Sequence, residues 1–288
     1  DYYIDGNIDY NTGNIVFVGN LTVKGDIKEG FSVQAGGNIH VEGTVEKSNV
    51  ECGGNLIVKQ GLIGSPLSKV IVKKDCRSGY LENVKIECDG NIFVEKHINH
   101  CLIKAGKKVF VGEENKKFGR IVGGKITAGE MISANEIGNQ YNTKTYIELT
   151  LNPFLKRKIE KIYQNLKKLS HEKKSIENNL NYIVHYLENL KNQEDGKIER
   201  YSQLKKEYEE TLPRMNKKIQ KFSEELQGME IEFTKGMKRK YLREILVNEK
   251  IYPGVSIVIR NIEKKTDKIY ENVKIYEKDE NIIFEPIQ

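Results

Sequence analysis

Apolar and polar residues alternate in short runs along the first 150 residues, and the runs return at a fixed interval. Residues 15–18 (IVFV) and 21–23 (LTV) are typical, and each is long enough for a strand of about four residues. Gly-Asn or Gly-Asp pairs separate the runs at six-residue steps, beginning at positions 13, 19 and 25. Three such steps make a repeat of about 18 residues.

A fixed period of this length, with strands too short for a meander of hairpins, predicts a β-solenoid over residues 1–150. Each coil would lay three strands on three faces of a prism, and the next coil would stack about 4.8 Å further on. We expect the corner side chains to bond along the stack in a ladder, and the glycines to supply positive φ at the corners. The predicted ladder consists of Asn20, Asn38, Asn55, Asp75 and Asn91, with Lys108 in the next coil.

Glycine almost vanishes after residue 150, and apolar residues recur every three or four positions. This heptad spacing predicts an antiparallel coiled-coil hairpin of two α-helices over 151–248, with a polar turn at 192–196. Pro213 is expected to start or bend the regular part of the second helix. The predicted seam includes Ile159, Ile162, Leu166, Leu169, Leu180, Ile183, Leu187, Ile219, Phe222 and Leu226.

The alternating pattern returns at the end of the chain. Residues 249–288 are therefore predicted to form strands that complete or cap the solenoid. Within them, residues 273–276 and 282–284 should pair as a terminal hairpin. Such a hairpin would cover the open end of the stack, where unpaired backbone otherwise recruits other chains.

Composition and charge indicate a soluble protein. The chain has 288 residues, 31% of them charged, and a formal net charge of +6. No run approaches 18 apolar residues, and the first 30 residues lack the features of a signal peptide. The basic excess lies mostly in the predicted hairpin. A basic arm that binds nucleic acid or an anionic membrane is one alternative function. Pairs such as Lys167-Lys168 fit the solvent-exposed faces of long helices better, so these partners are not expected.

The four cysteines, Cys52, Cys76, Cys88 and Cys101, contain no Cys-x-x-Cys pair, which predicts reduced thiols in a cytoplasmic protein. Cys52 and Cys88 lie 36 residues apart. Two coils would separate them by roughly 10 Å, beyond disulfide reach.

The sequence contains few candidates for catalytic or metal-binding residues. His97 and His100 are three positions apart and would face opposite sides of a strand unless a corner intervenes, so neither a metal site nor a cofactor is expected. No phosphate loop or hydrolase motif occurs. Hexapeptide acyltransferases share the 18-residue coil and use a catalytic histidine, for which His40 or His97 would have to serve. An acyltransferase-like or glycan-binding solenoid therefore stays the alternative to a non-enzymatic protein.

The order of these segments resembles the flagellar assembly protein A (FapA-like) family. The resemblance is carried by TGNIVFVGNLTVKGDIKEGF (12–31), AGGNIHVEGTVE (35–46), LENVKIECDGNIFV (81–94), GRIVGGKITAGEMISANEIG (119–138) and IYPGVSIVI (251–259). It implies a right-handed parallel β-helix that is completed after the hairpin; the coil period is also similar to that of bactofilins. We expect the family's N-terminal domain to be missing here.

The resemblance further implies a cytoplasmic, non-enzymatic bacterial scaffold for flagellar assembly or its positioning. Its partners would be other proteins, such as flagellar or polar assembly components, with self-association open and no small-molecule substrate. It brings no catalytic residues.

Overall fold

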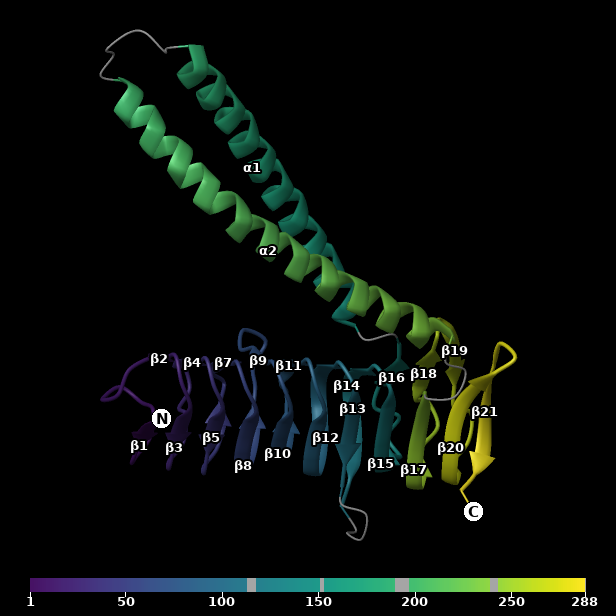
Figure 1. The fold of residues 1–288 in the computed structure, drawn as a ribbon. Helices are drawn as coiled ribbons and strands as arrows, with labels where there is room; N and C mark the ends of the chain where they lie inside the picture. Colours follow the sequence, from purple (N-terminus) through teal and green to yellow (C-terminus); the bar gives the residue numbers. More distant parts are fainter. Residues whose placement is uncertain (113–117, 151–152, 190–196, 239–242, 288) are drawn as a thin grey trace. The chain divides into compact units, whose positions relative to one another are not determined.

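The computed structural model describes residues 1–112, 118–150, 153–189, 197–238 and 243–287. The chain divides into two compact units, one of residues 1–154 with 239–288 and the other of Leu155–Lys238. The first unit is a parallel β-solenoid and the second is a helical hairpin, as the sequence predicts (Figure 1).

The strands of the solenoid stack in three rows, one for each face of the prism. The first row comprises β1 (Tyr2–Ile4), β3 (Leu21–Val23), β5 (Ile39–Val41), β8 (Leu56–Ile63), β10 (Cys76–Glu82), β12 (Ile92–Ala105), β13 (Lys108–Val111), β15 (Met131–Ile137) and β17 (Glu244–Ile251). The second row comprises β2 (Ile15–Phe17), β4 (Ser32–Ala35), β7 (Asn49–Cys52), β9 (Val70–Val72), β11 (Lys85–Cys88), the end of β12, β14 (Arg120–Ala128), β16 (Thr145–Leu149) and β18 (Ser256–Ile259).

The third row consists mostly of parts of longer strands, because several strands bend round a corner and serve two faces. It contains β6 (Val45–Glu46), the ends of β8 and β10, the middle of β12, the start of β14, and the ends of β15 and β17. Isolated bridges join Ile8 to Ile27 and Ile27 to Val45 before β6.

The core is a set of apolar columns inside the prism. Since side chains of a strand alternate between its faces, every second residue points inward, and the register repeats that choice in each coil. One inward column consists of Leu21, Ile39, Leu56, Cys76, Ile92, Val109, Ile132, Ile245 and Ile275. Each of these side chains is at most 1% exposed, so the stack is filled along its length.

The last part of the solenoid combines strands that come before the helical segment in the sequence with strands that come after it. β17 pairs in parallel with β15, and β18 pairs with β16. The predicted helical end at residue 248 lies inside β17, because residues 244–247 already alternate between half-buried and buried positions. β19 (Ile262–Lys265) and β20 (Tyr270–Lys278) then add antiparallel strands. β20 pairs with β21 (Asn281–Pro286), which confirms the terminal hairpin.

The second unit contains α1 (Leu155–Asn189) and α2 (Lys197–Lys238). The ring of Tyr186, near the end of α1, lies 4.8 Å from that of Tyr201, near the start of α2, as an antiparallel pair requires. α2 begins at Lys197, so Pro213 does not start it; the helix continues through this proline. The predicted turn at 192–196 lies outside the described residues.

Candidate interaction surfaces

The five predicted ladder residues lie in one column along a corner of the solenoid. In each step the side-chain Oδ1 of one coil accepts a hydrogen bond from the backbone N–H of the equivalent residue in the next coil. The N-to-Oδ1 distances are 2.8 Å from Asn38 to Asn20, 2.8 Å from Asn55 to Asn38, 3.1 Å from Asp75 to Asn55 and 2.7 Å from Asn91 to Asp75. The column therefore ties side chains to the backbone of the next coil rather than presenting them to a ligand.

Glycine precedes four of these five corner residues, Lys74 being the exception before Asp75, and at several of them the column leaves little room for a Cβ. A Cβ on Gly37 would overlap Asn20 Oδ1, and one on Gly54 would overlap Asn38 Oδ1. Neither glycine has a positive φ, and neither do the ladder asparagines. The expectation that the repeated Gly-Asn pair supplies left-handed corners is thus wrong at these positions: the absence of a Cβ on Gly37 and Gly54 lets two coils approach closely there.

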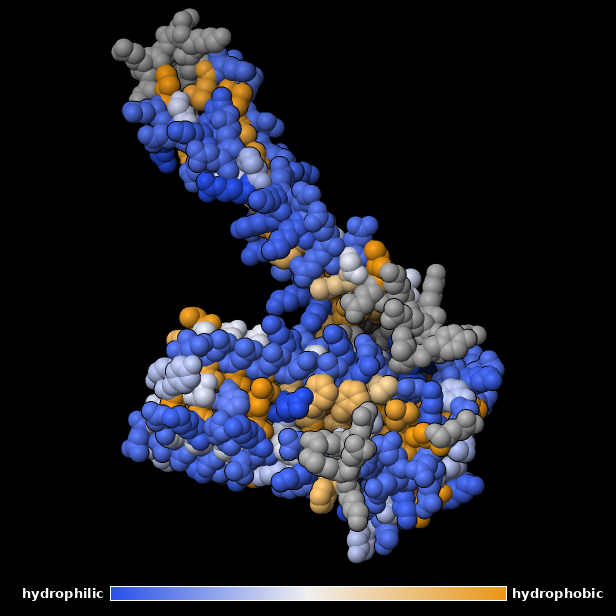
Figure 2. Space-filling model, turned by 60° about the horizontal axis from the view of Figure 1, so that its bottom comes forward, coloured by the Kyte–Doolittle hydropathy of each residue, from blue (hydrophilic) through white to orange (hydrophobic). Residues whose placement is uncertain are grey.

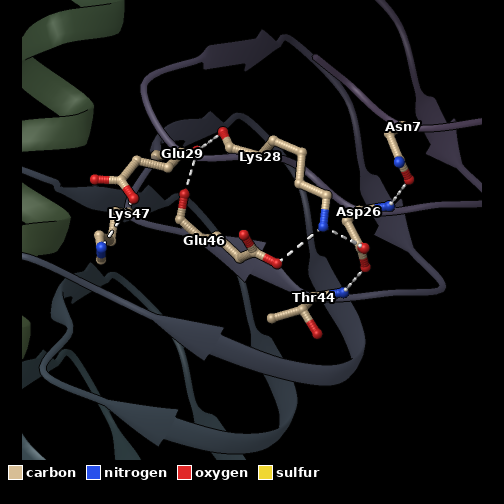
Figure 3. Close-up of polar contacts among 8 residues, drawn as sticks. Asn7, Asp26, Lys28, Glu29, Thr44, Glu46 and Lys47 are labelled. Atoms are coloured by element: carbon tan, nitrogen blue, oxygen red, sulfur yellow. Dashed lines mark hydrogen bonds and ion pairs between the residues drawn. The ribbon is translucent and has the colours of Figure 1, made fainter.

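A second column, which the sequence prediction missed, runs along another corner (Figure 3). Asn7 Oδ1 accepts from the N–H of Asp26 at 2.8 Å, and Asp26 Oδ1 accepts from the N–H of Thr44 at 2.7 Å. Lys28 Nζ lies 2.9 Å from Asp26 Oδ2 and 3.0 Å from Glu46 Oε1. The bonds from Lys28 and Thr44 lower the pKa of the Asp26 carboxyl. The signal was present in the sequence, since Asn7 and Asp26 also follow glycine.

Charged side chains on the outward faces pair with opposite charges in the neighbouring coil. Lys125 Nζ lies 2.7 Å from Glu148 Oε2, and Lys69 Nζ lies 3.0 Å from Glu87 Oε2. Such partly exposed pairs contribute roughly 0–1 kcal/mol each. Their main effect is to neutralise these faces and to favour one register.

His97 and His100 share a hollow, although residues three apart in a straight strand would not. His100 has φ of 51°, so a corner intervenes within β12. Both residues line a hollow of about 650 Å³ together with Lys96, Asn99 and Tyr141.

The histidines that a solenoid enzyme would need are engaged with carboxylates. His97 Nε2 lies 3.0 Å from Glu82 Oε1, and His40 Nε2 lies 2.8 Å from Glu42 Oε1. His97 also stacks on the Tyr80 ring, with centroids 5.5 Å apart. Among the described residues, no three His, Cys, Asp or Glu side chains gather as metal ligands would.

The cysteines are free and buried. Cys52 and Cys88 both pair in register with Val72, one from each side, which confirms their separation by two coils. Burial raises the pKa of Cys88 and of Cys101 to about 12. Because the thiolate is the nucleophilic form, these thiols are poor nucleophiles near neutral pH.

An apolar band crosses the outward side of the first strand row, where the sequence prediction placed no site. In register it runs through Ile57 (37% exposed), Arg77, Phe93, Phe110, Ser133 and Leu246. The Phe93 and Phe110 rings stack with centroids 5.4 Å apart, and the Arg77 guanidinium lies 5.2 Å from the centre of the Phe93 ring. Hydrophobic side chains form a band across the solenoid in Figure 2.

The ten predicted seam residues are all at least partly buried in α1 and α2. Ile162 and Ile183 are buried, and the other eight are half-buried. Several basic side chains have an acidic partner one helical turn away, as with Lys173 and Glu177 at 3.5 Å. The positive charge of the helices is thus partly balanced locally. No helix among the described residues combines the length and apolarity needed to cross a membrane.

Comparison with protein families matches residues 1–282 to the Flagellar Assembly Protein A (FapA) beta solenoid domain. Searches of curated proteins and of solved structures found no match. The matched span includes the solenoid, the helical hairpin and most of the terminal strands.

Proposed function

Because the chain belongs to the flagellar assembly protein A family, a family of flagellar assembly proteins, we propose that it is a non-enzymatic scaffold for that assembly or its positioning. It would act through protein–protein contacts of the solenoid and of the coiled-coil hairpin, without a cofactor. We place it in the cytoplasm, since its four cysteines are free and reduced thiols are the rule there.

One observation carries the proposal: the hairpin is an insertion that the solenoid does not need for its own pairing. The strands on either side of it, β16 and β17, take their places on β14 and β15 as any other coil would. The hairpin has its own seam and forms a separate compact unit. A helical element of this kind that adds nothing to the ladder of the stack is best explained as a surface for partners.

The test is complementation of a flagellated host that lacks its own copy of the gene. Leu180→Lys places a charge in the seam, whereas Asn179→Lys places the same charge on an exposed neighbour. We expect Asn179→Lys to restore the wild-type number of flagella per cell and Leu180→Lys to fail, at equal protein levels. Full restoration by a Leu180→Lys chain whose hairpin is unzipped would refute a scaffold role for the hairpin.

Ligand binding by the solenoid is a second candidate, favoured by the hollow that contains His97 and His100. Its exposed Tyr141 is able to stack on a sugar ring, while Lys96 and Asn99 supply hydrogen-bond donors. Calorimetric titration with bacterial cell-wall oligosaccharides tests this. Binding that His100→Ala and Tyr141→Ala both abolish would support a glycan-binding module. If none of the oligosaccharides gave a heat of binding, this candidate function would be ruled out.

A further inference from the structure

The order of residue types along the apolar band is the same from either end. Taken coil by coil, with the residue beyond each end included, its outward positions are His40, Ile57, Arg77, Phe93, Phe110, Ser133, Leu246 and Lys274. The order of residue types is therefore polar, aliphatic, polar, aromatic, aromatic, polar, aliphatic, polar. The centre of this symmetry lies between Phe93 and Phe110, whose rings are already parallel to within 6°.

From this order we propose that the band is a self-association face, on which a second copy of the chain packs with its solenoid axis antiparallel to the first. The two-fold axis would run along the strand direction between Phe93 and Phe110. Each Phe93 would then meet Phe110 of the second copy, and each Ile57 would meet Leu246 of the second copy. Two-fold interfaces are self-complementary in this way.

Charge selects the antiparallel arrangement over the parallel one. With parallel axes, each Arg77 would face its own copy, as would each Lys274, and like charges facing each other across an interface are unfavourable. With antiparallel axes, Arg77 meets Ser133, and His40 meets Lys274. His40 and Lys274 each carry a carboxylate of their own, Glu42 for the histidine at 2.8 Å and Glu244 for the lysine at 2.6 Å.

Spacing selects a second solenoid over an amphipathic helix. Successive residues of the band are about 4.8 Å apart, so Ile57 and Leu246 lie about 24 Å apart. A helix repeats every 5.4 Å along its axis and would fall out of step by about 3 Å over the same five coils. Another copy has the same spacing and matches at every coil. The face is small, on the order of 1,000 Å² in total, which belongs to the weak, concentration-dependent class of interfaces.

The test uses the full chain in sedimentation-velocity ultracentrifugation from micromolar to millimolar concentration. We expect the wild type to pass from monomer to dimer with concentration. Phe93→Glu and Phe110→Lys should each weaken dimerisation at least tenfold, because each puts a charge against a phenylalanine. Leu102→Glu, a change at an exposed apolar position of another strand row (54% exposed), should leave it unchanged.

Mixing the Phe93→Glu chain with the Phe110→Lys chain tests the orientation. In the antiparallel dimer, the carboxylate introduced at position 93 of one chain faces the ammonium introduced at position 110 of the other. The remaining phenylalanine pair is retained, so the mixture should form a heterodimer.

Three outcomes decide against the proposal or its orientation. A wild type that stays monomeric throughout overturns the proposal, and so does a dimer that persists in both single variants. Two monomeric variants that fail to associate on mixing overturn the antiparallel order. Circular dichroism spectra matching the wild type establish that the variants are folded.

Discussion

Two coils approach closely at the Gly-Asn corners, and Gly54→Ala tests whether that approach is required. Gly54 is buried, and a Cβ there would overlap Asn38 Oδ1 and lie 2.9 Å from Asn38 N and from Gly37 C. Gly6 precedes Asn7 in the same Gly-Asn pattern, but a Cβ there would meet nothing within 4 Å. Neither glycine has a positive φ. The two positions therefore share a sequence context and differ only in what lies against them.

The magnitudes follow from these contacts. Gly54→Ala forces the coils apart locally and should destabilise the solenoid by about 1–3 kcal/mol, as overpacked sites do. Gly6→Ala should stay within about 0.5 kcal/mol of wild type. Asn38→Ala removes one bond at an exposed corner and should cost about 0.5–1.5 kcal/mol. The double variant at positions 38 and 54 should lose less than the sum of the two, since the overlapping oxygen is gone, but the backbone contacts at 2.9 Å remain.

Thiol labelling supplies the assay. All four cysteines lie buried in the solenoid and none lies in the hairpin, so their reaction with a disulfide reagent during urea titration reports opening of the solenoid alone. The free energy of opening should rank Gly6→Ala with wild type, then Asn38→Ala, then Gly54→Ala as the least stable. If Gly54→Ala opened no more readily than Gly6→Ala, close approach of the coils would not be the reason for the repeated glycine.

Three further outcomes test other parts of the structure. Leu180→Lys should reduce the helical circular dichroism signal while leaving thiol labelling unchanged; simultaneous loss of both would show that the two units do not fold separately. Gly228→Ala, at an exposed helical position with open space around it, should stabilise the hairpin by about 0.5–1 kcal/mol in a thermal melt monitored at 222 nm. The pKa of Asp26 is lowered from 3.8, so its ion pair stabilises the fold above that value and is lost as pH falls through the folded pKa. Asp26→Asn should therefore be less stable than wild type at neutral pH, by under about 1 kcal/mol, and the difference should vanish in acid.

The periodicity of the sequence was sufficient to predict the stack, its three strand rows and the pair of packed helices. Each rests on a repeat that recurs many times, as at Asn20, Asn38 and Asn55, so a single exception does not hide it. The helical boundary at 248 was wrong because Ile245, Leu246 and Val247 suit a helix or a strand equally, and pairing with β15 decides between them. The handedness of the winding stays a prediction from the family resemblance, since spacing alone does not determine it.

The features that sequence reasoning missed are those that depend on two coils at once. The role of Gly54 is set by the side chain of Asn38, which lies 16 positions earlier. The apolar band arises because Phe93 and Phe110 come into register one coil apart. Neither residue is unusual in its own strand, and only the register shows that the two rings lie next to each other.

The insertion point shows how one chain accommodates two units. Because β17 must reach β15 and β18 must reach β16, the segment Leu155–Lys238 is a loop whose two ends have to return to the same coil. The entropic cost of closing such a loop rises only slowly with its length, by about 0.6 kcal/mol for each doubling. An antiparallel helix pair lowers even this cost, since it brings the chain back toward its starting point. The solenoid should therefore tolerate a broken seam, whereas the hairpin should lose its helical structure when its seam is broken.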